Sequence, residues 1–291
     1  MIPVRLNLSL CLLLIPALSS LLLLAACRDW GWGLLPLALA YAWFGHLAYA
    51  LLHEAEHGVL MPSRRLNNAL GVLLGIFFPA PFHLLRQSHL HHHRANRGEG
   101  ECFDLIQEGE NPWWKRAMFY GILCGTFWLT TALFGNLIAA LAPGLLRSRH
   151  LHFDRAAQAL GENLDPAADL PIRLEAWAIF AIYGALFAFA PHPAQALLLL
   201  ASFGVSWSSL QYVHHFGSLR DTQRGAWNLH LPFPWLDRLM LNHNLHYRHH
   251  QRPELPWTEL PHHPMPGEPA SIPFFLAWLR QWRGPRPEKP S

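Results

Sequence analysis

The hydrophobic pattern divides the first fifty residues into two long apolar runs separated by a short polar turn. Residues 6–26 form an uncharged run of 21 residues, and another uncharged run extends from Trp30 to Leu52. A helix of about 20 apolar residues crosses the roughly 30 Å hydrocarbon core of a bilayer. We therefore predict transmembrane helices over about 6–26 and 33–52, joined as a tight hairpin.

The first run also has features of a cleaved secretory signal. Arg5 precedes a leucine-rich core, and Leu24-Ala25-Ala26-Cys27 resembles a lipoprotein cleavage box. The core is longer than the roughly 7 to 15 apolar residues of a signal peptide. We favour a retained span that pairs with the second run, with cleavage as the alternative.

A second helical hairpin is predicted around residue 190. The stretch 176–219 contains no Asp, Glu, Lys or Arg, and Pro191-His192-Pro193 divides it. Proline interrupts helices because it lacks a backbone donor. We predict spans over about 174–190 and 194–213.

Two further uncharged runs, 66–85 and 117–146, are interpreted as segments that dip into the membrane or lie on its surface. Pro79 and Pro81 interrupt the first run, and the second follows Trp113-Trp114-Lys115-Arg116, a pattern typical of interfacial anchors. A single crossing at either run would separate the histidine clusters described below. The predicted fold is an all-α integral membrane protein, with four transmembrane helices as two hairpins, re-entrant or interfacial helices and a histidine-bearing cap.

Composition and charge support this interpretation. Charged residues make up 14% of the chain, against about 25% in ordinary globular proteins. The net charge of +3 argues against nucleic acid as a partner. The predicted turns on the side away from the histidines offer only Arg28, and the other Lys and Arg residues gather on the histidine-rich side. By the positive-inside rule we expect a multi-pass protein of the bacterial inner membrane, with the histidine-rich side cytoplasmic.

The whole chain, 1–291, is predicted to form one domain with a proline-rich C-terminal tail over 251–291. Phe274, Phe275, Trp278 and Trp282 indicate a short helix on the membrane surface. The four cysteines are far apart and contain no C-x-x-C pair, so neither a disulfide framework nor a thiolate metal site is expected.

Most of the 20 histidines fall in short clusters at the ends of the predicted membrane segments. One is H-x-x-x-H at the end of the second span, and two contain H-x-x-H-H, within residues 88–93 and 242–250. Residues at i, i+3 and i+4 share one helix face, so each cluster points its imidazoles to one place. The eight predicted ligands are His53, His57, His89, His92, His93, His246, His249 and His250.

Eight converging imidazoles exceed the four ligands of one zinc site. Imidazole also suits iron, so the ligand count favours a multinuclear transition-metal centre with iron as the first choice. We expect His91 to face solvent or an outer carboxylate, His46 to be a packing or cavity residue rather than a ligand, and His243 to be the alternative ligand of its cluster. Carboxylates that could orient the imidazoles are Glu54, Glu56, Glu101, Asp104 and Asp237.

These motifs resemble the three histidine boxes of the membrane fatty acid desaturase and hydroxylase family. The resemblance covers residues 34–261 and includes the box order, the hairpin before the last box, and Pro253-Glu254-Leu255-Pro256-Trp257 after it. It implies two iron ions, dioxygen as co-substrate, and hydrogen removal from an unactivated C–H bond of a lipid acyl chain. Desaturation is expected, with hydroxylation or decarboxylation to a terminal alkene as alternatives.

Stearoyl-CoA-type desaturases of this family carry a further ligand histidine four residues after an amide side chain. Gln211 and His215 have that spacing, although Gln replaces the family's Asn. The resemblance thus implies His215 as a ninth ligand and Gln211 as a polar group acting through water, with His214 as the alternative. Electrons are expected from a separate ferredoxin-like donor.

Two functions of other classes compete. His53-Glu54-Ala55-Glu56-His57 also matches the H-E-x-x-H motif of zinc metalloproteases, with Glu54 as general base. An intramembrane protease would give the other clustered histidines no function. A metal transporter is the second alternative, but transport sites lie near the bilayer midplane, whereas these clusters end helices.

Overall fold

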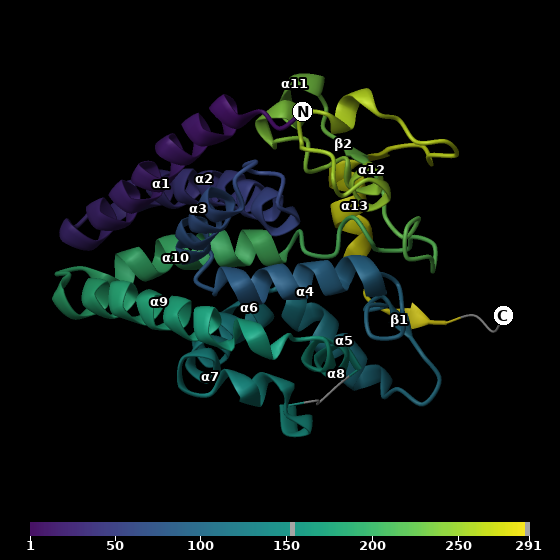
Figure 1. The fold of residues 1–291 in the computed structure, drawn as a ribbon, viewed down its shortest axis with the longest axis horizontal. Helices are drawn as coiled ribbons and strands as arrows, with labels where there is room; N and C mark the ends of the chain where they lie inside the picture. Colours follow the sequence, from purple (N-terminus) through teal and green to yellow (C-terminus); the bar gives the residue numbers. More distant parts are fainter. Residues whose placement is uncertain (152–154, 289–291) are drawn as a thin grey trace.

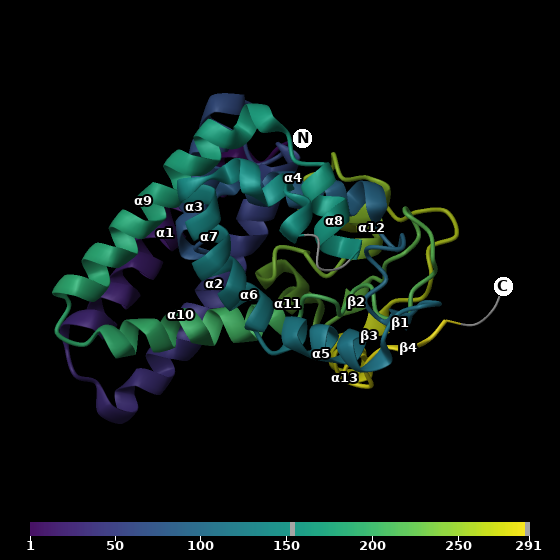
Figure 2. The same ribbon diagram turned by 90° about the horizontal axis from the view of Figure 1, so that it is seen from below.

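Four long helices form the elongated part of the molecule. The computed structural model describes residues 1–151 and 155–288. Helix α1 (Val4–Cys27) pairs with α2 (Leu34–His57) through the turn η1 (Gly31–Gly33), and α9 (Asp169–Phe189) pairs with α10 (Pro193–Ser208). The two hairpin turns meet, because His192 N donates to Ala26 O at 2.9 Å. Figures 1 and 2 show these helices on one side of the molecule and the C-terminal elements on the other.

Three helices of the described chain are long and apolar enough to cross a membrane: Val4–Cys27, Gly31–His57 and Pro166–Phe189. They contain the first two predicted spans and all but the last residue of the third. Helix α10 ends at Ser208, five residues before the predicted end of the fourth span, and its 16 residues extend only about 24 Å. The chain then forms successive turns that direct residues 209–217 into the cap. The full four-span topology stays a prediction.

The two ambiguous runs form bent helix pairs. Helices α3 (Arg64–Phe77) and α4 (Phe82–Ala95) meet at 97°, and α5 (Pro112–Leu123) meets the helical stretch 126–141 at 78°. The predicted interruption at Pro79 and Pro81 is therefore confirmed. Gly125 makes the second bend with φ of +91°, a conformation that glycine adopts without steric cost. The stretch 126–141 consists of α6 (Thr126–Thr130), η2 (Thr131–Gly135) and α7 (Asn136–Leu141).

Short helices and strands form the cap, which is the part of the molecule that carries the histidine clusters, and the segments next to it. The C-terminal tail folds back onto the protein through two parallel strand pairs, β1 with β4 and β2 with β3. The short helix predicted near the C-terminus is present as α13, and its place on a membrane surface stays a prediction. These elements are β1 (Leu105–Ile106), η3 (Pro143–Arg147), η4 (Arg149–Leu151), α8 (Arg155–Glu162), η5 (Pro166–Ala168), β2 (Leu229–His230), α11 (Pro234–Leu239), α12 (His246–Gln251), η6 (Leu260–His262), β3 (Ile272–Pro273), α13 (Phe274–Gln281) and β4 (Arg286–Pro287).

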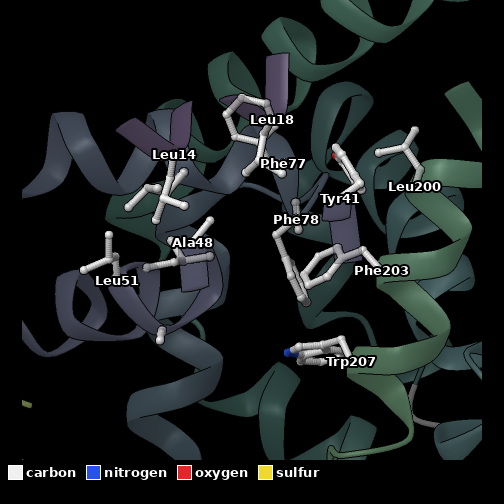
Figure 3. Close-up of a cluster of buried hydrophobic side chains, with 14 of the residues drawn as sticks. Leu14, Leu18, Tyr41, Ala48, Leu51, Phe77, Phe78, Leu200, Phe203 and Trp207 are labelled. Atoms are coloured by element: carbon white, nitrogen blue, oxygen red, sulfur yellow. The ribbon is translucent and has the colours of Figure 1, made fainter. Parts of the chain in front are cut away.

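The main core lies where α1, α2, α3 and α10 meet (Figure 3). Phe203 of α10 packs directly on Gly45 of α2, where an added Cβ would lie 2.5 Å from its ring. His46 Nε2 forms a hydrogen bond with Ser206 Oγ at 3.1 Å, and the ring packs edge-on against Phe203. His46 is thus a packing residue, as predicted.

Trp257 fastens the tail to the ends of two long helices. Its backbone N donates to Glu54 Oε2 at 3.0 Å, and its indole Nε1 donates to Asn7 Oδ1 at 3.0 Å. All three residues are buried. The segment after the last histidine cluster therefore holds the cap against α1 and α2.

Candidate metal centre

Four parts of the chain bring imidazoles to one place in the cap. The end of α2 supplies His53 and His57, α4 supplies the second cluster, the turn after α10 supplies His215, and α12 supplies the third cluster. Helix α12 has only six residues, but the i, i+3, i+4 spacing of its histidines still places all three on one face of the helix. The convergence predicted from spacing is present.

Five histidines form the first group. Each offers a ring nitrogen, and these nitrogens all lie within 4.8 Å of one another. His89 Nε2 is 2.7 Å from His57 Nε2 and 3.1 Å from His93 Nε2, which is 3.0 Å from His249 Nε2. The members are His53, His57, His89, His93 and His249.

Four histidines form the second group, under the same 4.8 Å limit: His92, His215, His246 and His250. His246 Nε2 lies 3.1 Å from both His215 Nε2 and His250 Nε2. The two groups are adjacent, because the rings of His93 and His250 stack with centroids 4.2 Å apart. The nine histidines expected as ligands are the nine that the structure gathers.

The donor geometry fits one metal ion in each group. Two nitrogens bound at about 2.1 Å to one ion lie about 3.0 to 3.4 Å apart at angles of about 90° to 109°. The Nε2 separations are close to this range, and His53 Nε2 is buried with no hydrogen-bond partner among the described residues. Metal coordination would satisfy that nitrogen.

The electrostatics of the third cluster favour metal binding. Burial, and after it the neighbouring imidazoles, lower the pKa of His246, His249 and His250 well below the ordinary value of 6.5. These rings are therefore neutral at pH 7. Neutral imidazole is the form that binds a metal.

Partners of the outer ring nitrogens fix two of the imidazoles in place. His215 Nδ1 donates to Gly225 O at 2.7 Å, which leaves Nε2 to face the second group. Glu101 Oε2 lies 3.1 Å from His92 Nδ1, so Glu101 has the contact expected of it, and its orienting role stays a prediction. Glu56 Oε2 lies 3.9 Å from His89 Nδ1, beyond hydrogen-bond distance.

The other three carboxylates expected to orient imidazoles have structural partners instead. Glu54 accepts the Trp257 backbone hydrogen bond, Asp104 pairs with Arg97, and Asp237 accepts from Asn244 Nδ2 at 3.0 Å. Sequence spacing could not separate them from Glu101, because each is polar and close to a histidine cluster.

The alternative ligands lie outside both groups. His214 Nδ1 lies 3.4 Å from Trp227 O, and the His243 ring stands beside that of His53 with centroids 4.7 Å apart. Gln211 is exposed, and its role through water stays a prediction. His91 is rotated away from the groups as expected, but the expectation that its ring could face solvent is wrong. The ring is buried, with neither nitrogen hydrogen-bonded to a described residue, although the Glu101 carboxylate is close enough to act on it electrostatically.

A buried latch that sequence analysis missed holds the turn bearing His215. Tyr212 OH accepts from Arg97 Nη1 at 2.5 Å and donates to Asp104 Oδ1 at 2.9 Å, and Gly217 N donates to Asp104 Oδ2 at 2.7 Å. Arg97 also pairs with Asp104 directly and has a left-handed φ of +60°. From the sequence alone, Arg97 is interpreted only as one of the basic residues that indicate the orientation in the membrane.

A second missed pair anchors the start of α4. His83 Nδ1 lies 2.5 Å from Glu175 Oε1, and His83 N donates to Glu175 Oε2 at 3.0 Å. Glu175 is buried in the first turns of α9. The pair connects the helix of the second cluster to a long apolar helix, and neither residue belongs to a recognisable motif.

The fold and the gathered histidines define a helical metalloprotein whose imidazole clusters sit at the ends of long apolar helices. The family model for fatty acid desaturases matches residues 30–264, which is most of the chain. The chain belongs to the fatty acid desaturase family. A search of curated proteins found no match.

Proposed function

We propose that this protein is a membrane-bound di-iron oxidase that desaturates a lipid acyl chain. The observation that carries the proposal is the pair of adjacent groups built from imidazole nitrogens, five in one and four in the other. Family membership supports an oxidoreductase acting on acyl chains. The proposed ligands of the two irons are the nine gathered histidines, with Gln211 acting through water.

Two bound irons would supply the redox chemistry by which dioxygen and two external electrons remove hydrogen from an unactivated C–H bond. The chain's own residues hold and orient the metal and restrict water. His53, His249 and His250 are each no more than 5% exposed. Glu101 and the Gly225 carbonyl fix the ring orientations of His92 and His215.

We propose a separate ferredoxin-like protein as the electron donor. Cys11 and Cys102 are buried, Cys27 and Cys124 are exposed, and all four are free. They offer no cluster of thiolates such as an iron–sulfur centre requires. The basic residues on the histidine-rich side support a cytoplasmic active site, and we propose a bacterial inner membrane as its location.

The metalloprotease alternative loses its general base in this geometry. Glu54 is 4% exposed and its carboxylate accepts the Trp257 backbone hydrogen bond, so it is committed to holding the tail. A protease base must instead face a water on the metal.

The test is mass spectrometry of lipids from cells with and without the chain, grown with oxygen. Loss of two hydrogens from an acyl chain supports desaturation, whereas gain of one oxygen identifies a hydroxylase and loss of the carboxyl group a decarboxylase. Unchanged lipids in cells supplied with iron and donor would contradict the proposal.

A further inference from the structure

A cavity lies on the far side of the turn that carries His215, away from the metal groups. Its volume is about 180 Å³, it is partly open to solvent, and it is bordered by that turn, the β2–β3 region and α13. Its lining combines an apolar wall with three guanidinium groups. The wall residues include Val213, Phe216, Trp227, Ile272 and Ala277, and the cations are Arg280, Arg283 and Arg286.

The cavity is preformed because its walls are fixed by buried contacts. Val213 and Ala277 belong to one buried cluster. Ile272 N donates to Asn228 O at 3.0 Å, and Gln281 Nε2 donates to Ser209 O at 2.5 Å. Helix α13 is thus held rigidly against the end of α10.

The three arginines carry positive charge that the described residues do not balance. All three are exposed, and none forms an ion pair with a described carboxylate. Two acids next to residues of the cavity are engaged elsewhere: Asp104 binds Arg97 and accepts from Gly217 N, and Glu288 pairs with Arg220. An apolar cavity beside three free guanidinium groups suits an anion that also has an apolar part.

The position of α13 indicates where this anion comes from. The helix packs at Ser209, the residue that directly follows the apolar helix α10. Phe275 and Leu279 on its outer face are about 60% exposed, and Tyr120 OH of α5 donates to Trp282 O at 3.2 Å. Exposed aromatic and aliphatic residues at the end of a membrane helix are typical of the headgroup level of a bilayer, and α10 is the fourth span predicted from the sequence.

We propose that this cavity binds the phosphate of an anionic phospholipid headgroup. Guanidinium groups bind phosphate oxygens through paired hydrogen bonds. The apolar wall would contact the glycerol backbone and the upper acyl carbons. Anionic lipids are concentrated in the cytoplasmic leaflet, where juxtamembrane arginines attract them. The site is separate from the metal centre, so this proposal goes beyond the oxidase function and does not depend on it.

The test is native mass spectrometry of the full-length protein in detergent, titrated separately with phosphatidylglycerol, phosphatidylcholine and glycerol 1-phosphate. Phosphatidylglycerol should bind at the lowest concentration. The variant R280Q/R283Q should weaken that binding roughly 25-fold, and R286Q about fivefold, because each arginine near a lipid surface contributes about fivefold. R64Q/R65Q removes two exposed arginines from the start of α3 and should leave binding unchanged.

Two results would overturn the proposal: equal binding of phosphatidylglycerol and phosphatidylcholine, or wild-type binding of phosphatidylglycerol by both R280Q/R283Q and R286Q. Tighter binding of glycerol 1-phosphate than of the lipid would overturn the lipid source and identify a soluble phosphate ligand. All three arginine side chains are exposed, so these variants are expected to fold.

Discussion

At the scale of single residues, the position of one ring nitrogen decides which histidine can bind metal. His214 and His215 are adjacent in sequence, yet only His215 directs a nitrogen into the second group. The His214 ring stands 4.6 Å from that of His246 without joining the group. A helix-spacing argument could not separate them, because residues 209–217 form turns.

Replacing His215 should therefore be more damaging than replacing His214. We expect H215A to lose one of the two irons and nearly all activity, because its group falls to three imidazoles. H214A should retain both irons. Metal analysis of the two purified variants checks this pair, and iron loss confined to H214A would show that the turn is placed wrongly.

Glu101 provides a second test at this scale, since it is the one predicted carboxylate within hydrogen-bond distance of a ligand ring. E101Q should weaken iron binding about 10- to 100-fold by loosening the orientation of His92. E99Q is the matched control, because Glu99 is 72% exposed and pairs with Arg155. Competition with a chelator measures both affinities, and identical values would exclude the orienting role.

At the scale of elements, the short helix α12 needs outside support. Its six residues carry three proposed ligands, and a helix of that length is not stable alone. Arg248 of α12 binds Glu268 through Nε at 2.9 Å and Nη2 at 2.9 Å, and Glu268 also accepts from Asn228 Nδ2 at 2.7 Å. The tail beyond the last histidine cluster thus positions that cluster.

The variant E268Q should destabilise the cap by about 1.5 to 3 kcal/mol, the range for hydrogen bonds to charged groups. Burial alone would raise the pKa of Glu268, but the hydrogen bonds from Arg248 and from Met265 N outweigh it and leave the pKa below 4.5. The stabilisation is therefore present above pH 4.5 and is lost as the pH falls below it. Thermal melting at pH 7 and at lower pH should show a difference from wild type that shrinks on acidification.

The control for this change is E254Q, which removes an exposed carboxylate paired with Arg252 on the same tail. Exposed pairs contribute about 0 to 1 kcal/mol, so its melting should stay close to wild type. Equal melting of E268Q and E254Q at pH 7 would contradict the role of the Arg248–Glu268 pair.

At the scale of the whole molecule, the hairpin turns and the cap lie at opposite ends of the long helices (Figure 2). This arrangement could be predicted because long apolar runs and histidine spacing are patterns within short stretches of the sequence. Such patterns can be recognised without knowledge of the tertiary structure. The latch of Arg97, Asp104 and Tyr212 joins positions more than a hundred residues apart. Such contacts depend on how helices meet, which explains why neither this latch nor the end of α10 was predicted.

The native Cys27 tests the orientation of the molecule. It is exposed beside the turn between α1 and α2, whereas Cys11 and Cys102 are buried. In a C124S background, a membrane-impermeant maleimide should label Cys27 from the periplasmic side of intact cells, and C27S should abolish the signal. Labelling only in inverted vesicles would place the cap in the periplasm.

The most direct test of the central claim is the metal content of the full-length protein purified after growth with iron. The five-histidine and four-histidine groups predict about two irons per chain. A variant that replaces His93 and His250, at the junction of the groups, leaves four imidazoles in one group and three in the other, so it should lose the iron of the smaller group. A single tightly bound zinc, with iron absent after reconstitution, would contradict the di-iron account.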